Sequence, residues 1–210
     1  MGDRSFVRFG GLAAILLALS SWAAVLTYYT AAQGGQDLVG VEMTQLLSAL
    51  AAFWSLFAIV AVHWTVRGHG EAWSLFAVVV GVTASAATIM SSLYPIAFTR
   101  HLLRQPIDVT VPLPTAVSPT DPLNVMTFGL TGLWFLIANL LLRRAPVPRR
   151  LAVLGLIVAA DLLVGLLASL SAQDALVSFA AIAAGAIAGP AYWLWLGFVL
   201  RRIAVASAAR

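Results

Sequence analysis

Six apolar segments, each about twenty residues or longer, limit most strongly what this chain can fold into. They cover about two-thirds of its 210 residues, at roughly 6–29, 45–65, 72–95, 123–142, 151–171 and 175–200. At a rise of about 1.5 Å per residue, each can cross about 30 Å of hydrocarbon as a helix. A backbone in lipid must satisfy its own hydrogen bonds, and the alternating pattern of membrane strands is absent from the sequence. We therefore predict an all-α, polytopic membrane bundle of six transmembrane helices, forming a single domain over residues 1–210.

The composition excludes the main soluble classes. Hydrophobic residues make up 61% of the chain and charged residues 10%, against roughly a quarter in soluble domains. The mean hydropathy is +0.96. A soluble fold of this length could not bury so much apolar surface, which argues against a soluble enzyme and a nucleic-acid module. The net charge of +4 comes from arginines at the ends of apolar segments, where they indicate which side of the membrane each end faces.

The arginines predict the orientation of the chain. With the N-terminus in the cytoplasm, ten arginines lie inside and two outside, which is a strong positive-inside bias. An even number of crossings then returns the C-terminus to the cytoplasm. The inner residues are Arg4, Arg8, Arg67, Arg143, Arg144, Arg149, Arg150, Arg201, Arg202 and Arg210, and the outer ones are Arg100 and Arg104.

The one long connection, residues 96–122, is expected on the outside. Its first part, Ile96–Arg104, mixes apolar and basic residues in a way that suits a short helix on the membrane surface. Its second part is rich in proline, which favours an extended chain. The connection is either a surface tether or a lid or docking surface.

Asp161 is the strongest polar anomaly, because it lies at the midpoint of the fifth apolar segment. An aspartate there costs ~2.5–3.5 kcal/mol on insertion scales. By depth, its expected partners on other helices are Ser55, Thr83 and Thr131. The functional interpretation is a proton or ligand site. The structural interpretation is a neutral carboxylic acid that bridges two helices or faces a small wet cavity.

Small residues at helical spacing predict faces for close packing between membrane helices. The third segment carries Gly81, Ser85, Thr88 and Ser92, and the sixth carries Gly185 and Gly189. The simpler interpretation is packing within this chain, and the functional one is a face for another subunit. Pro190 should kink the last helix and leave a backbone carbonyl without its donor.

No catalytic, metal or cofactor site is predicted. Cysteine and lysine are absent, which removes thiolate chemistry and Schiff bases. No H-E-x-x-H or Walker A sequence is present. The histidines do not pair at one depth within the spans, so a haem held by two of them is not expected. Asn139 is interpreted as forming a hydrogen bond between helices.

The layout of the whole chain resembles a family of uncharacterised six-helix bacterial integral membrane proteins, a domain of unknown function. The resemblance rests on Arg8-Phe-Gly-Gly-Leu-Ala near the start, and on Gly189-Pro-Ala-Tyr-Trp-Leu-Trp-Leu-Gly197 followed by Arg201-Arg202 near the end. It implies this fold and a place in the bacterial cytoplasmic (inner) membrane. It implies no site residues.

From the sequence we expect a non-enzymatic membrane protein, a structural or accessory subunit that associates with other membrane subunits or with itself. The lipid bilayer is its other expected partner, and nucleic acid is not expected to bind. The alternative is a small-molecule binding or transport component with its intramembrane carboxylate at Asp161.

Overall fold

The computed structural model describes residues 2–32, 37–102 and 122–206, and these residues are almost entirely helical. In chain order the elements are α1 (Gly2–Thr27), the π-helical turn η1 (Tyr28–Ala32), α2 (Leu38–Val66), the short η2 (Arg67–His69), α3 (Glu71–Leu102), α4 (Pro122–Leu142), α5 (Arg149–Leu170), α6 (Asp174–Ala180), the π-helical η3 (Ala181–Ala188) and α7 (Gly189–Ala206). The elements α6, η3 and α7 follow one another without interruption, so the described residues form six helices.

Five of these helices are long and apolar enough to cross a membrane. They lie at Arg4–Ala32, Leu38–His69, Glu71–Phe98, Arg149–Leu170 and Asp174–Val205. In α4, the apolar part with described side chains is the shorter Phe128–Leu142. The predicted all-helical membrane bundle is therefore confirmed at the level of five candidate spans.

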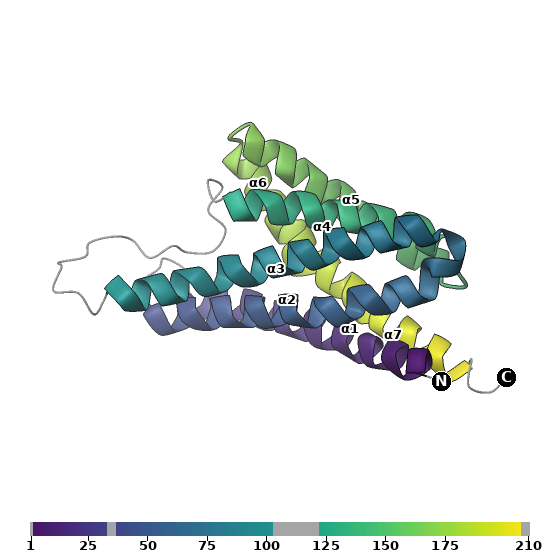
Figure 1. Cartoon of the computed structure of the whole chain (residues 1–210). Helices are drawn as coiled ribbons and strands as arrows, with labels where there is room; N and C mark the ends of the chain where they lie inside the picture. The colour runs from purple at the N-terminus through teal and green to yellow at the C-terminus, as the bar shows by residue number, and fades with distance from the viewer. Residues whose placement is uncertain (1, 33–36, 103–121, 207–210) are drawn as a thin grey trace.

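The bundle consists of two groups of helices, which meet where α3 packs against α4 and are bridged by the last helix (Figure 1). Helices α1, α2 and α3 lie side by side, as do α4, α5 and α6. The last helix starts beside α5 as α6 and ends beside α1 as α7. The two groups diverge toward one end of the bundle, and the last helix runs between them.

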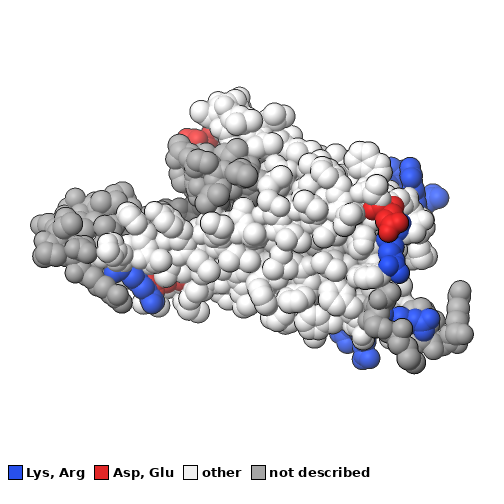
Figure 2. All heavy atoms as spheres, in the orientation of Figure 1, with Lys and Arg blue, Asp and Glu red and all other residues white. Residues whose placement is uncertain are grey.

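The two ends of the bundle differ in charge. We call the end where α1 begins and α7 ends the arginine end, because Arg8, Arg67, Arg149 and Arg201 lie at helix ends there. Figure 2 shows most of the visible basic side chains at this end and one at the other end. The opposite end, which holds the turn after α5, is the distal end.

Helix α3 is longer than the sequence analysis expects. It passes through Pro95 and ends at Leu102, so residues 96–102 continue α3 in place of the separate surface helix expected there. Proline removes one helical donor, but a backbone in an apolar environment has no better partner than its own helix. The rest of the predicted outer connection, residues 103–121, lies outside the described residues.

An ion pair fixes this extension of α3 to α2. Arg100 Nε and Nη2 donate to the two carboxylate oxygens of Glu42, over 2.8 and 2.6 Å. A bidentate arginine–carboxylate contact constrains direction as well as distance. It therefore aligns the distal ends of α2 and α3 with each other.

Glycines allow α1 to pack closely on two sides. A Cβ on Gly10 would overlap that of Ala61 on α2, and a Cβ on Gly11 would lie 2.8 Å from the Gly197 carbonyl on α7. Small residues let helix backbones approach in this way inside a membrane. The Gly-Gly pair of the sequence motif thus places α1 between α2 and α7.

A buried polar contact joins α4, α5 and α7 near the arginine end. Tyr192 Oη donates to Asn139 Oδ1 over 3.0 Å, and Asn139 Nδ2 donates to the Phe135 carbonyl over 2.7 Å. Both Tyr192 and Asn139 are fully buried. Gly155 on α5 faces the amide, which a Cβ at that position would overlap. The predicted hydrogen bond of Asn139 between helices is confirmed.

Candidate functional site

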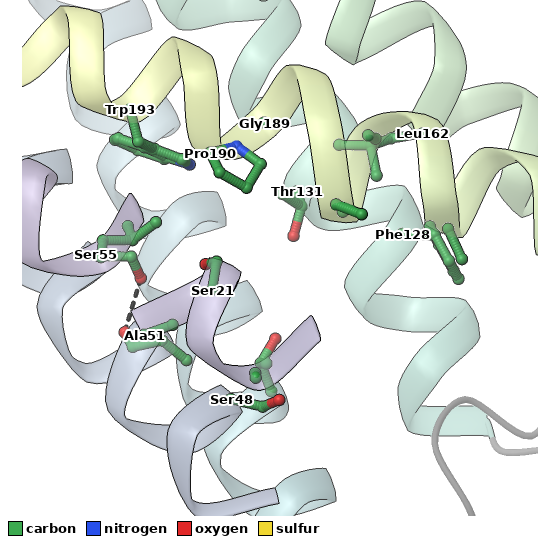
Figure 3. A pocket seen from close by; sticks show the side chains of 18 of the residues that line it. Ser21, Ser48, Ala51, Ser55, Phe128, Thr131, Leu162, Gly189, Pro190 and Trp193 are labelled. Atoms are coloured by element: carbon green, nitrogen blue, oxygen red, sulfur yellow. Dashed lines mark hydrogen bonds between the residues drawn. The ribbon is translucent and has the colours of Figure 1, made fainter. Parts of the chain in front are cut away.

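A cavity of about 540 Å³ lies between the two groups of helices. All six helices contribute to its wall, from Tyr28 near the distal end to Trp193 at the level of the aromatic core. It fills the space where the groups diverge, and Figure 3 shows it from close by. Its volume falls in the range of pockets that hold drug-sized molecules.

The wall of the cavity is apolar but carries many hydroxyl groups. None of the described residues that line it is charged. The serines and threonines come from five of the six helices: Ser21, Thr44, Ser48, Ser55, Ser85, Thr88, Thr131 and Ser178. Tyr28 and Tyr29 add two phenol groups on the distal side. Such a wall suits an uncharged molecule with a few polar atoms.

Two of these hydroxyls join α2 to α3. Ser55 Oγ lies 2.6 Å from Ser85 Oγ. Each also reaches a carbonyl of its own helix, Ser55 that of Ala52 over 2.6 Å and Ser85 that of Gly81 over 2.8 Å. Two hydroxyl hydrogens cannot serve three contacts at once. Each serine oxygen also has two lone pairs, so this pair, which lines the cavity, has acceptor capacity left over.

Stacked aromatic rings close the cavity toward the arginine end. The rings of Trp134 on α4 and Trp193 on α7 stack at 4.9 Å with an angle of 14°. Gly81 on α3 makes room for this pair, because a Cβ there would lie 2.6 Å from Trp134 Cδ1. The floor of the cavity thus depends on a glycine from a third helix.

One wall of the cavity is π-helical. In η3 the hydrogen bonds run five residues back, as shown by the Gly189 N–H, which donates to the Ala184 carbonyl. At Pro190 no N–H exists, so the return to α-helix leaves the carbonyls of Gly185 and Ala186 without a helical donor. Trp22 Nε1 on α1 donates to the Ala186 carbonyl over 3.0 Å. The indole thus replaces the missing helical donor.

The two glycines of this wall have different surroundings. A Cβ on Gly189 would overlap the Ala184 carbonyl, so glycine is needed there for the π-helical turn. Around Gly185 a Cβ would meet nothing within 4 Å. Gly185 is exposed and also lines the cavity, so a larger side chain has room there at the cavity wall.

Asp161 lies behind this wall, and the turn after α5 brings it there. Ala172 takes a positive φ of 54°, and the Gln173 N–H donates to the Ala168 carbonyl over 2.9 Å. These contacts end α5 and reverse the chain, so that the following helix runs antiparallel to α5. Residues equally distant from this turn then face each other, as Gly165 faces Ala180. By the same count Asp161 faces Ala184.

The side chain of Asp161 meets the backbone of η3. The backbone amide of Ala184 is the polar group of η3 that lies next to the carboxylate. The other oxygen, Oδ2, is buried and has no hydrogen-bond partner among the described residues. Asp161 itself does not line the cavity, whereas Ala184 does.

The three expected partners of Asp161 form their contacts elsewhere. Ser55 bonds to Ser85, and Thr83 is exposed and donates to the Val79 carbonyl over 2.8 Å. Thr131 points into the cavity (Figure 3). Equal depth in the membrane does not fix how each helix is rotated about its axis, and rotation decides which side chains meet.

The predicted small-residue face of α3 contacts this chain's own helices and its cavity. Gly81 receives Trp134, Ser85 meets Ser55, and Thr88 lines the cavity. Ser92, one turn further, is buried. This face is accordingly occupied within the bundle.

The cavity is a site that the sequence alone does not reveal. Four hydroxyl residues of its wall, Ser21, Thr44, Ser48 and Ser178, had no role there as a group. The available signal was the recurrence of hydroxyls in the distal halves of several spans. These hydroxyls form one site only when the helices pack together.

Among the described residues, no three histidine, aspartate or glutamate side chains come close enough to hold a metal ion.

No protein-family model matches the chain, and no curated protein or solved structure shows significant similarity to it. The cavity and its π-helical wall are therefore the basis for the function proposed below.

Proposed function

We propose that this chain is a multi-pass membrane protein that binds a small, uncharged, amphipathic molecule in its central cavity. The supporting observation is the cavity of about 540 Å³, with hydroxyls from several helices and no charge on the described lining residues. A pocket of this kind recognises a ligand by shape and by a few hydrogen bonds. The acceptor capacity of Ser55 and Ser85 and the carbonyl of Gly185 favour a ligand with hydrogen-bond donors.

The proposed topology is six crossings with both termini in the cytoplasm of a bacterial cell. It rests on the arginine end, where most of the described basic residues lie. The cavity then lies in the outer half of the membrane, with Tyr28 and Tyr29 nearest the outer surface. A molecule could reach it from outside the cell or from the outer leaflet.

The other function expected from the sequence, an accessory subunit, has less support. The small residues that would form a partner face, Gly81 and Ser85, contact Trp134 and Ser55 within the chain. Gly185 lines the cavity and Gly189 lies against its own helix. Binding therefore remains the better proposal.

Filling the cavity tests the proposal. In the variant Gly185→Phe the ring enters space that holds no atom within 4 Å of the Cβ position. Gly68→Phe is the matched control, because Gly68 also has nothing within 4 Å but lies in η2 at the arginine end. Both variants add the same ring, so a difference in ligand binding between them reports the filling of the cavity.

The measurement is quenching of tryptophan fluorescence by bromododecanol, an uncharged alcohol, with the protein in phosphatidylcholine vesicles. Trp134 and Trp193 line the cavity and should be quenched saturably. Lipid-facing tryptophans should be quenched in proportion to the probe. We expect the saturable part in the natural protein and in Gly68→Phe, and its loss in Gly185→Phe. A saturable part that persists in Gly185→Phe would contradict the proposal.

A further inference from the structure

The π-helical wall of the cavity contains a backbone carbonyl without a helical donor, that of Gly185. Pro190 has no N–H to donate to it, and the Gly189 N–H donates to a different carbonyl. Trp22 Nε1 satisfies the neighbouring carbonyl of Ala186. We infer that the Gly185 carbonyl accepts a hydrogen bond from a hydroxyl group of the ligand, and that the ligand is a long-chain alcohol. This inference rests on the proposed function and names the chemical class of its ligand.

The Gly185 carbonyl is open to the cavity. Gly185 is exposed, lines the cavity and has no side chain to shield its backbone. In a helix the carbonyl of a residue lies beside the residues four and five positions later. Those residues, Gly189 and Pro190, also line the cavity, and Figure 3 shows both at its wall. Glycine is the usual residue where a backbone approaches a ligand closely, and a carbonyl in apolar surroundings is stabilised by a donor.

Free hydroxyl groups of the cavity complete the recognition of an alcohol. Five of the lining hydroxyls already contact carbonyls of their own helices, namely those of Thr44, Ser48, Ser55, Ser85 and Thr88. Ser21 on α1 and Thr131 on α4 also line the cavity but form no such bond within the described part of the chain. A hydroxyl group can donate and accept. A ligand hydroxyl that donates to Gly185 therefore keeps an oxygen that can accept from Ser21 or Thr131.

This arrangement favours an alcohol over other uncharged amphiphiles. Ketones, esters and ethers carry acceptors only, so they cannot bond to the Gly185 carbonyl. The last helix lines the cavity from Val177 on the distal side to Trp193 at the aromatic floor. Between Val177 and Gly185 it offers about 12 Å of wall to an apolar chain. The hydroxyl group thus lies toward the floor of the cavity and the chain toward the distal end.

Two probes that differ by one O–H test the inference, bromododecanol and its methyl ether. The ether keeps the chain, the bromine and the oxygen but cannot donate. Saturable tryptophan quenching of the natural protein in phosphatidylcholine vesicles gives both affinities, each expressed as mole fraction of probe in the membrane. We expect the alcohol to bind about fivefold more tightly. Equal affinities would overturn the inference and leave the proposed function standing, whereas no saturable quenching by either probe would overturn both.

Pro190→Ala tests whether the proline makes the acceptor available. In a π-helical register the restored N–H donates to the Gly185 carbonyl, and in an α-helical register it donates to Ala186 while the Gly189 N–H donates to Gly185. The Gly185 carbonyl is occupied in both cases, so the preference for the alcohol should fall below about twofold.

Pro95→Ala is the matched control, because Pro95 lies within α3 and does not line the cavity. It restores an N–H in the same way and should keep the full preference. A full preference in Pro190→Ala would contradict the inference. If that variant fails to fold, the comparison of the two probes on the natural protein still decides, since it needs no substitution.

Discussion

The indole Nε1 of Trp22 on α1 donates to the carbonyl of Ala186 on η3 over 3.0 Å. The contact joins two segments 164 residues apart at the point where Pro190 removes the helical donor. A backbone carbonyl in an apolar environment needs a partner. Trp22 supplies it, and so holds α1 against the π-helical wall of the cavity.

Trp22→Phe removes this donor and keeps the ring. We expect the free energy of unfolding to fall by about 1 kcal/mol, because the Ala186 carbonyl is left without its donor. Unfolding in mixed micelles with increasing SDS measures the change. Trp73→Phe is the control, since Trp73 is 63% exposed at the start of α3, and its effect should stay within about 0.5 kcal/mol.

Pro190→Ala tests whether proline creates the need for Trp22. Alanine restores the backbone N–H, which can then donate to the carbonyls of Gly185 or Ala186 within the helix. Trp22→Phe should therefore cost less in the Pro190→Ala background, and a double-mutant cycle measures the difference. An equal cost in both backgrounds would contradict the link.

Gly81→Ala should disturb the aromatic floor. Its Cβ would lie 2.6 Å from Trp134 Cδ1, so Trp134 must shift against Trp193. Overpacking of this kind costs about 1–3 kcal/mol. Near-ultraviolet circular dichroism should report the change in ring stacking, and SDS unfolding its free energy. Gly185→Ala, with nothing within 4 Å, should be neutral or stabilise the protein, and a loss as large as that of Gly81→Ala would argue against steric overlap as the cause.

Tyr192→Phe should destabilise the junction of α4, α5 and α7. It removes the donor to Asn139 Oδ1, which is fully buried and cannot reach water instead. An unsatisfied buried acceptor costs about 1–3 kcal/mol. Tyr94→Phe, at a position 66% exposed, is the control and should change the free energy of unfolding little. Similar stability of the two variants would show that the Asn139 contact adds nothing.

Single cysteines test the topology, and the chain contains no cysteine of its own. Gly68→Cys lies at the arginine end and Gln173→Cys in the turn after α5. With a membrane-impermeant maleimide on intact cells, we expect labelling of Gln173→Cys only. Gly68→Cys should react after the membrane is opened. Labelling of both in intact cells, or of neither, would refute opposite locations.

Several structural features were predictable because they depend on local sequence. Apolar length defines the helices, and the missing N–H of Pro190 defines a free carbonyl nearby. The contact between Asp161 and Ala184 could have been expected by counting from the turn after α5. Depth in the membrane alone instead favours Ser55, Thr83 and Thr131 as partners of Asp161, because it takes no account of the antiparallel register of neighbouring helices.

Other features were not predictable for physical reasons. Pro190 indicates a carbonyl in need of a donor, but any of several helices could provide one, and only the tertiary structure selects Trp22. The third apolar segment was expected to end at residue 95, whereas α3 continues to Leu102 and meets Glu42 through Arg100. A helix boundary near proline depends on tertiary partners as well as on the missing donor.

The sequence by itself determined that this protein is a helical bundle with segments long and apolar enough to cross a membrane. A backbone in lipid must satisfy its own hydrogen bonds, and in long apolar segments a helix does so. Only the tertiary structure decided which hydroxyls share a cavity, which glycine admits Trp134 and which backbone amide lies next to Asp161. Those outcomes depend on how each helix is rotated and spaced, and in an alanine- and leucine-rich chain many rotations satisfy the same apolar pattern.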